Sequence, residues 1–310
     1  MSTLYHYTTL DALVGLFSDC TSENNKIVFW ASHALFSNDI TEKKIWYEIF
    51  FDALIEFEKQ YENIIEEDFK FSEVYKDNKD FYDINFRTVN IFENYTHTGE
   101  GLNYFISLSR NEDTLSMWEM YAKRGTGIAI GFNDKKLKSY VENLHQKNKE
   151  LRGYLRECIY HKKEESVKHE MLETMKAQYL SYKKLSDKKF EDFGRLYGKA
   201  DASNIRKFRT LYLLSFFNID LSTMIKDKSF FYENEVRILI KENRELNFRV
   251  SNNLITPYIK YPIDASLIER IIIAPVANFE LNKIAVSKML SYKGVNNEIP
   301  IIKSSIPYRI

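Results

Sequence analysis

Short strand-like segments separated by a long, charged helical stretch are the sequence feature that most constrains the fold of this chain. Residues 134–228 are rich in Lys and Glu and carry apolar residues at helical spacing. The strand candidates on either side, all rich in β-forming residues, are residues 4–9, 26–32, 104–110, 127–132, 235–241, 247–250, 269–275 and 300–306. Strands segregated from helices in this way predict an α+β protein with a mostly antiparallel, mixed sheet.

The length and composition favour one ordered domain. The chain has 310 residues, of which 15% are aromatic, with only 10 Gly and 5 Pro. This balance is typical of a densely packed fold rather than of linkers or disorder. We therefore expect a single domain over residues 1–310, with a polar insertion at about 66–101 and a helical insertion at about 134–228.

Charge and cysteine content narrow the class of protein. Lys plus Arg and Asp plus Glu both total 44, so the net charge does not favour nucleic acid or an anionic membrane as a partner. The 2 cysteines show no zinc-type spacing, and neither a metal site nor a disulfide framework is predicted. We find neither a secretory leader nor an apolar stretch of about 20 residues, so the expected location is the cytoplasm.

The first strand candidate ends in a turn into a helix. His6 lies near the end of the segment LYHYTT, and Thr8 with Asp11 three residues later forms a short capping box. A histidine here can contact a ligand hydroxyl, or can be a hydrogen-bonded packing residue.

Charged residues interrupt the strand candidate YENEVRI. Side chains alternate along a strand, so we expect Glu233, Glu235 and Arg237 to share one face. Such a face is either an ion-pair ladder or a solvated groove in which a carboxylate stabilises positive charge, since buried unpaired ions are costly. The spacing alone leaves both interpretations open.

Two further pairs are candidates for a binding site. Ser107 and Ser109 share a strand face and leave room for a ligand, although an exposed strand face would carry serines equally well. No G-x-S-x-G elbow supports a serine nucleophile. Trp118 and Tyr121 share a helix face that could stack a flat ring, but aromatic residues at this spacing are more often part of a core.

The ordered motifs LYHYTT, FISLSR, MWEMYA, GIAIGF and YENEVRI, with the final PYRI, resemble an uncharacterised bacterial family that contains a domain of unknown function. Where that family usually has Asn-Asp-Pro-Phe-Glu, this chain has Asn38, Asp39, Ile40, Thr41 and Glu42. The resemblance covers nearly the whole chain and names no activity.

A more distant resemblance is to the ADP-ribosyltransferase fold, which binds NAD in the cleft of a split sheet and transfers ADP-ribose. It rests on a strand-borne histidine followed by Thr, a Ser-x-Ser strand and a later Glu-x-Glu strand. It implies that Glu235 is the catalytic carboxylate, that Glu233 assists acceptor activation and that His6 contacts a ribose hydroxyl. Many members have Gly after the histidine, where this chain has Tyr7.

The resemblance also implies a set of cofactor-binding residues. The residues expected to contact NAD are His6, Tyr7, Thr8, Ser107, Ser109, Arg110, Trp118, Tyr121 and Arg237. The expected function is that of an ADP-ribosyltransferase-like enzyme that modifies a macromolecule, as a toxin or a phage-defence effector with an antidote or defence partner. The alternative is a non-catalytic module that recognises a nucleotide, RNA or protein, in which Arg110 and Arg237 pair with the two carboxylates.

Overall fold

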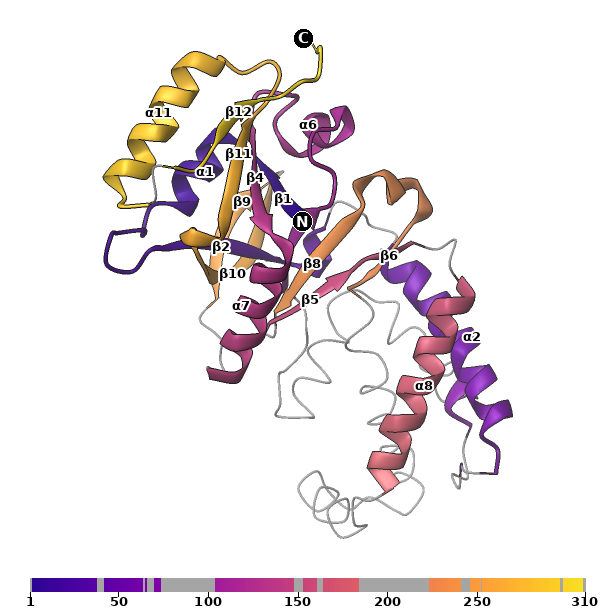
Figure 1. Ribbon diagram of the computed structural model, residues 1–310. Helices are drawn as coiled ribbons and strands as arrows, with labels where there is room; N and C mark the ends of the chain where they lie inside the picture. The colour runs from indigo at the N-terminus through magenta and orange to yellow at the C-terminus, as the bar shows by residue number, and fades with distance from the viewer. Residues whose placement is uncertain are drawn as a thin grey trace. The chain divides into compact units, whose positions relative to one another are not determined.

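The structure is a computed structural model. It describes residues 2–37, 42–63, 65, 70–73, 104–147, 153–160, 164–183, 223–240, 246–251, 253–295 and 298–308. The chain divides into two compact units (Figure 1). The first comprises residues 1–38, 102–158 and 229–310, and the second comprises residues 39–101 and 159–228.

The first unit is built on a ten-stranded sheet. The order along its main path is β12 (Ile301–Lys303), β11 (Ile268–Ile273), β4 (Ile128–Asn133), β1 (Thr3–Thr8), β3 (Tyr104–Ser109), β2 (Lys26–His33), β10 (Leu254–Asp264) and β9 (Asn247–Ser251). Off this path, β8 (Glu235–Ile240) pairs with both β3 and β5 (Gly153–Glu157). Within this sheet only β11 and β12 are parallel among the described pairs, so the predicted α+β class with a mixed, mostly antiparallel sheet is confirmed.

The sheet forks at β3. One edge of β3 pairs with β8 along its whole length. The other edge is shared, because β1 pairs with it at Ser109 while β2 pairs with it at Tyr104 and Phe105. Among the described strands, residues 106–108 have Cα partners in β8 alone. The fork therefore leaves a gap between β1 and β2, and it is produced by the paths of the main chain.

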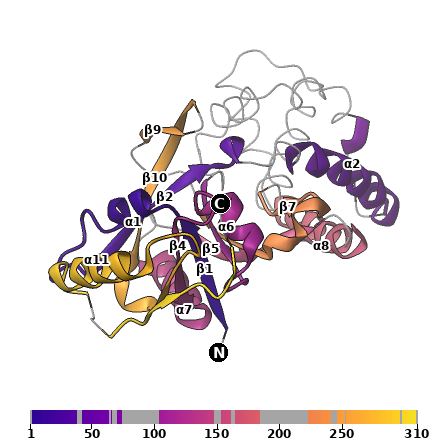
Figure 2. The same ribbon diagram turned by 90° about the horizontal axis from the view of Figure 1, so that it is seen from above.

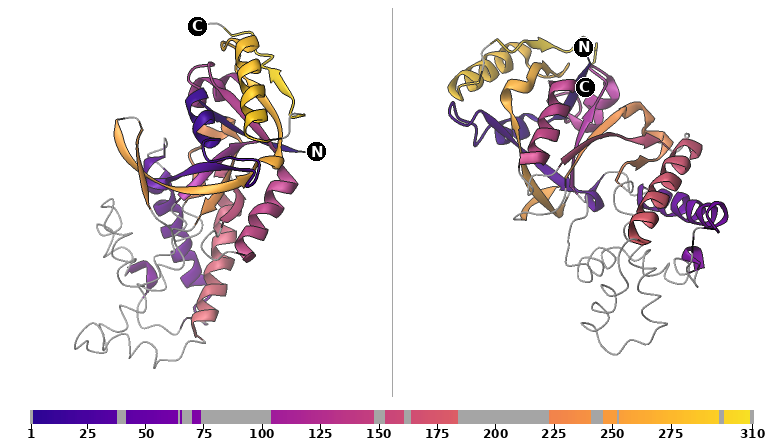
Figure 3. Two further views of the ribbon diagram at one scale, coloured as in Figure 1. Left: turned by 90° about the vertical axis from the view of Figure 1, so that its left-hand side faces the viewer. Right: turned by 60° about the horizontal axis from the view of Figure 1, so that its bottom comes forward.

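Helices cover both faces of this sheet. The larger core lies on one face, where strand residues such as Ile130 and Ile238 pack with α1 (Leu10–Leu16), α7 (Asp134–Lys147) and α11 (Phe279–Tyr292). Figures 2 and 3 show α1 and α11 near each other on this side. On the other face, α6 (Leu115–Tyr121) packs Met117 and Trp118 against Tyr5 and Tyr7 of β1. Because side chains alternate along a strand, odd-numbered residues of β1, β3 and β8 lie on the α6 face.

The second unit contains a helix pair. The helices α2 (Glu42–Gln60) and α8 (Glu164–Lys183) pack together, and an aromatic cluster joins Phe57, Phe71 and Tyr179. The short strands β6 (Ile159–Tyr160) and β7 (Ile225–Lys226) pair in parallel. The described part of this unit is mainly helical.

Several local expectations are corrected by the structure. The cap of α1 is Thr9 rather than Thr8, since the Thr9 side chain accepts a hydrogen bond from the Ala12 amide. Glu233 ends the 3₁₀ helix η4 (Lys228–Glu233), and Asn234 has a φ of 46°, so the strand begins only at Glu235. The stretch expected to be helical also contains the strand β5, because Gly153–Glu157 pairs with β8.

Two expectations concern segments that lie largely outside the described residues. Most of the expected polar insertion at 66–101, and the tract from Asn38 to Thr41, lie outside them. The described residues also contain the 3₁₀ helices η1 (Ala34–Phe36) and η5 (Ala265–Leu267). None of the described helices combines the length and apolar character that crossing a bilayer demands.

Candidate functional site

A cavity of about 240 Å³ lies where β1 and β2 diverge from β3. Its walls come from β1, α1, β2, β3 and β9. The residues that line it are His6, Tyr7, Thr8, Ala12, Leu16, Phe29, Trp30, Ser32, Phe105, Ile106, Ser107 and Arg249. The N-terminal segment thus contributes three consecutive residues to one hollow. The short strand and the immediate turn into α1, fixed by the Thr9 cap, keep these residues at its wall.

His6 bridges the fork. Its Nδ1 atom lies 2.9 Å from the carbonyl oxygen of Ser107. A carbonyl can only accept a hydrogen bond, so Nδ1 carries the proton and Nε2 of the neutral ring is an acceptor. Burial lowers the pKa of His6, the Ser107 carbonyl opposes this, and the guanidinium of Arg249 lowers it further. A neutral imidazole that offers an acceptor suits a ligand hydroxyl.

Tyr7 and Thr8 continue the wall from His6. The Tyr7 hydroxyl donates to the carbonyl oxygen of Asn111 at 2.9 Å, and burial strongly raises the pKa of this phenol. The Tyr7 ring packs edge-on against Trp118, with ring centroids 4.8 Å apart. Trp118 is fully buried and donates its indole N–H to Asp113 at 2.6 Å. It therefore belongs to the core and supports Tyr7 from behind, and it does not line the cavity.

The two serines of β3 have different environments. Ser107 is exposed although it lies in a central strand whose other residues are buried, and it lines the cavity. Ser109 is buried, and its hydroxyl donates to the carbonyl oxygen of Glu233 at 2.6 Å. Ser109 therefore holds the end of η4 against β3, while Ser107 leaves the open space that a ligand needs.

Glu235 and Arg237 form a buried ion pair on β8. Arg237 donates from Nε to Oε1 of Glu235 at 2.9 Å and from Nη2 to Oε2 at 3.2 Å, with only 1% and 5% of the two side chains exposed. The guanidinium also lies 4.1 Å from the centre of the Phe105 ring, which lines the cavity. Two parallel N–H···O bonds fix the carboxylate firmly.

The pairing register relates this ion pair to the cavity. Arg237 is the Cα partner of Ser107, and Glu235 is the Cα partner of Ser109. Directly opposite residues of an antiparallel pair share a face, so all four lie on the α6 face of the sheet. Neither Glu235 nor Arg237 lines the cavity. Their ion pair lies on β8, which is the strand next to β3, and Ser107 of β3 lines the cavity.

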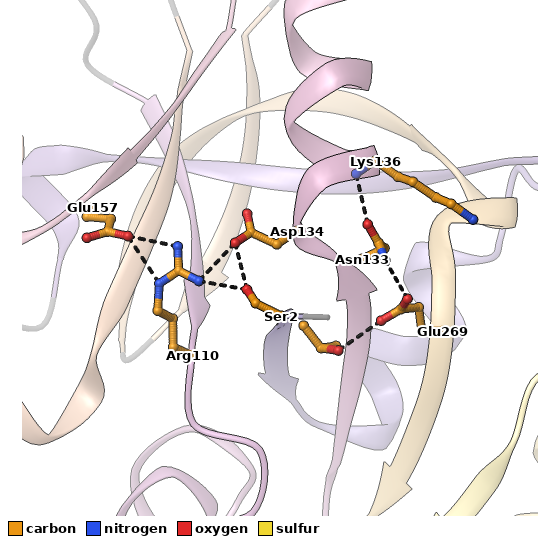
Figure 4. Close-up of polar contacts among 8 residues, drawn as sticks. Ser2, Arg110, Asn133, Asp134, Lys136, Glu157 and Glu269 are labelled. Carbon is orange, nitrogen blue, oxygen red and sulfur yellow. Dashed lines mark hydrogen bonds and ion pairs between the residues drawn. The ribbon is translucent and has the colours of Figure 1, made fainter.

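Two other predicted residues have partners away from the cavity. The hydroxyl of Tyr121 donates to Glu233 in a short hydrogen bond. Arg110 pairs with Asp134 at 2.9 Å and with Glu157 at 2.8 Å, as Figure 4 shows. In the same view Ser2 contacts Asp134 and Arg110, and Asn133 contacts Glu269 and the main-chain amide of Lys136. Arg110 thus ties together β3, α7 and β5 rather than facing the hollow.

The structure brings together one part of the predicted site at the cavity and another part beside it. The first part is His6, Tyr7, Thr8 and Ser107. The second part, on the same sheet face as Ser107, is Ser109, Glu235 and Arg237. Arg110, Trp118, Tyr121 and Glu233 have roles in packing and hydrogen bonding outside the cavity lining.

Sequence reasoning missed Arg249 and the residues around it. Arg249 comes from β9, and it reaches Ser32 of β2, to whose hydroxyl it donates at 2.7 Å. The alternation of polar and apolar residues in NFRVS was the available signal, because it assigns Asn247 and Arg249 to one face. Within the described residues, no group of three His, Cys, Asp or Glu side chains could hold a metal ion.

Comparison with known sequences supports one of the two resemblances. Residues 117–238 match the family model described as "Protein of unknown function (DUF2971)". This segment contains the motifs MWEMYA, GIAIGF and YENEVRI and runs from α6 to β8. No curated protein and no solved structure matches the chain. The predicted resemblance to a family of unknown function is confirmed over residues 117–238, where the chain is similar to this family.

Proposed function

We propose that this protein is an ADP-ribosyltransferase-like enzyme that binds NAD at the fork of the sheet. The observation that carries the proposal is the convergence of His6, Tyr7, Thr8 and Ser107 on one cavity between two diverging strands. The resemblance described above expects these residues to contact NAD in a split sheet. The cavity is smaller than the roughly 300–1,000 Å³ of sites that enclose a drug-sized ligand, so it would take one half of the dinucleotide.

The polar atoms of the cavity suit a ribose. The neutral His6 ring offers an acceptor at Nε2, because its Nδ1 proton is directed to Ser107. A ribose hydroxyl is a donor of the matching kind. The exposed hydroxyl of Ser107 can donate or accept, and Phe29 and Phe105 supply apolar wall. We therefore assign the nicotinamide riboside half of NAD to this hollow.

Glu235 would be the catalytic carboxylate. In the proposed reaction the bond from C1′ of the ribose to the nicotinamide nitrogen breaks, and its electron pair leaves with nicotinamide. The acceptor forms a new bond to C1′ and loses a proton. Positive charge develops on the ribose, where a fixed carboxylate stabilises it more than it stabilises bound NAD. Arg237 would hold this carboxylate in place, and Glu235 is the Cα partner of Ser109, two residues along β3 from the cavity-lining Ser107.

The setting of the reaction follows the resemblance. The acceptor in this proposal is a macromolecule, either protein or nucleic acid, in the cytoplasm. The activity would serve as a toxin or in defence against phage, with an antidote or defence partner to restrain it.

Nicotinamide release from labelled NAD tests the proposal. The purified chain, with and without cell extract as a source of acceptor, is expected to release nicotinamide. Glu235→Gln should reduce the rate by about 100-fold or more, as expected for losing one electrostatic contact to the transition state. The matched control is Asp113→Asn, which also removes a charge from a hydrogen-bonded carboxylate but does not touch the cavity. Equal rates for these two variants would contradict a catalytic role for Glu235.

A non-catalytic binding module is the second candidate. The observation that favours it is that both oxygens of Glu235 already accept hydrogen bonds from Arg237. In this case NAD or ADP-ribose would bind, with heat measurable by calorimetry, and no nicotinamide would appear with any extract. His6→Ala would then weaken binding while Glu235→Gln would change only stability.

A further inference from the structure

Arg249 is a cation in the cavity wall with unused hydrogen-bonding capacity. It is half-buried and donates from Nη2 to the Ser32 hydroxyl at 2.7 Å. Its Nε atom is buried and has no hydrogen-bond partner. Leaving a donor of a charged group unsatisfied is costly, so this guanidinium can gain from an acceptor that a ligand brings to the cavity.

Arg249 has no carboxylate partner in the part of the chain that the structure describes. Among the described residues, no carboxylate lies within ion-pair distance of it, and no Asp or Glu lines the cavity. By contrast, Arg110, Arg237 and Arg270 each pair with a carboxylate. Burial lowers the pKa of Arg249, which is the effect of removing a cation from water without an anion beside it.

Aromatic rings hold the guanidinium in place. Its central carbon lies 5.7 Å from the centre of the Trp30 ring and 5.8 Å from that of Tyr258. These two rings stack on each other, with centroids 5.0 Å apart. A guanidinium fixed in this way loses little freedom when it binds a second group, so its planar fork is prepared for an oxyanion.

We propose that Arg249 binds the phosphate group of a phosphorylated sugar or nucleotide in this cavity. Two features point to this ligand class. The Arg249 fork fits an oxyanion such as phosphate, and Nε2 of His6, which lines the same cavity, is an acceptor for a hydroxyl donor. A ribose phosphate carries both groups. The inference rests on the cavity assigned in the proposed function, but it requires no catalysis.

Calorimetric titration of the intact chain tests this assignment. The probes are ADP-ribose, ADP and ribose 5-phosphate, with adenosine as the ligand that has the sugar without the phosphate. The wild type should bind the phosphorylated probes at least about 10-fold more tightly than adenosine. Arg249→Gln should weaken binding of the phosphorylated probes by about 10- to 100-fold and leave adenosine unchanged.

Two further variants control for charge and folding. Arg249→Lys keeps the charge but loses the fork, so an intermediate affinity is expected. Arg156→Gln removes an equal charge from an exposed arginine outside the cavity lining, and its affinity should equal that of the wild type. Thermal unfolding of each variant shows whether it is folded at the temperature of the titration.

The outcomes separate this inference from the proposed enzyme. Phosphate-dependent binding that Arg249→Gln abolishes supports the inference, even when no nicotinamide is released. If Arg249→Gln binds ADP-ribose as tightly as the wild type, or if adenosine binds as tightly as ADP, the inference is overturned. Nicotinamide release with an unchanged KM in Arg249→Gln would overturn it while leaving the enzyme proposal intact.

Discussion

His6 of β1 and Ser107 of β3 are joined by a hydrogen bond of 2.9 Å at the place where the two strands separate. This bond uses a main-chain carbonyl in a part of β3 that pairs only with β8 among the described strands. It therefore replaces a missing ladder bond, and it fixes both the position and the tautomer of the imidazole.

Stability should fall with acidification because of His6. Its pKa in the folded protein is lowered from 6.5, mainly by burial, so the unfolded chain takes up a proton first as the pH falls. The stabilisation that neutral His6 gives the folded state is lost as the pH falls from the unfolded pKa to the folded pKa. The loss is no more than about 1.4 kcal/mol per pH unit. Urea unfolding between about pH 5.5 and 7.5 should show a shallower pH dependence for His6→Gln than for the wild type. Identical dependences would contradict a lowered pKa for His6 in the folded protein.

The Glu235–Arg237 pair should show strong coupling. Removing either partner leaves the other charge buried, so Glu235→Gln and Arg237→Met should each cost roughly 3–5 kcal/mol in the free energy of unfolding. The double variant removes both charges and should cost clearly less than the sum. A double-mutant cycle measured by chemical denaturation checks this expectation. Additive costs would mean that the pair contributes no mutual stabilisation.

Asp113 should anchor the C-terminal segment. Its carboxylate accepts hydrogen bonds from the Trp118 indole at 2.6 Å, the Ser304 hydroxyl at 2.7 Å and the Ser305 amide at 2.7 Å. Burial raises the pKa of Asp113, but these bonds outweigh it, and the pKa is lowered from 3.8. The stabilisation is therefore present above that value and is lost as the pH falls through the folded pKa.

The test for Asp113 is the substitution Asp113→Asn. It should cost roughly 1–3 kcal/mol of stability at neutral pH, since the amide cannot accept all of these bonds. Amide hydrogen exchange should increase at Ser305 and Ile306, where the segment is held. Unchanged exchange in a destabilised variant would show that other contacts hold the segment.

Gly127 and Gly15 offer a contrasting pair of alanine substitutions. A Cβ atom at Gly127 would overlap the carbonyl oxygen of Thr8, a residue of the cavity wall. A Cβ atom at Gly15 in α1 meets only Trp30, at an ordinary 3.8 Å. Gly127→Ala should therefore destabilise the fold by roughly 1–3 kcal/mol, whereas Gly15→Ala should stabilise it by about 0.5–1 kcal/mol. Thermal unfolding of the two variants measures the difference.

The parts of the fold set by local patterns could be predicted from the sequence. The strand LYHYTT, the helix after it and the strand YFISLSR have the expected positions, because alternation and capping act over a few residues. The strand β10 was not predicted, since Pro257 and Pro262 interrupt its pattern. Pro262 lies in its pairing with β2, a strand distant in the sequence, and Pro257 lies in its pairing with β9.

The candidate site shows the same division between local and long-range information. His6 and Ser107 stand out in the sequence, because they are polar residues at a strand end and within a strand, whereas Tyr7 and Thr8 are implied only by the resemblance to the ADP-ribosyltransferase fold. Glu233 was assigned to the wrong element because the left-handed backbone of Asn234 breaks the strand pattern. Arg249 was missed because its importance comes from Ser32, Trp30 and Tyr258, which only the sheet order brings near.

The fork at β3 has a consequence for how such proteins can diversify. The cavity exists because the main chains of β1 and β2 diverge along β3, and no single side chain creates it. Replacing the wall residues would alter what the hollow accepts while the hollow itself persists. A scaffold of this kind could change its ligand by a few substitutions, without having to evolve a new binding site.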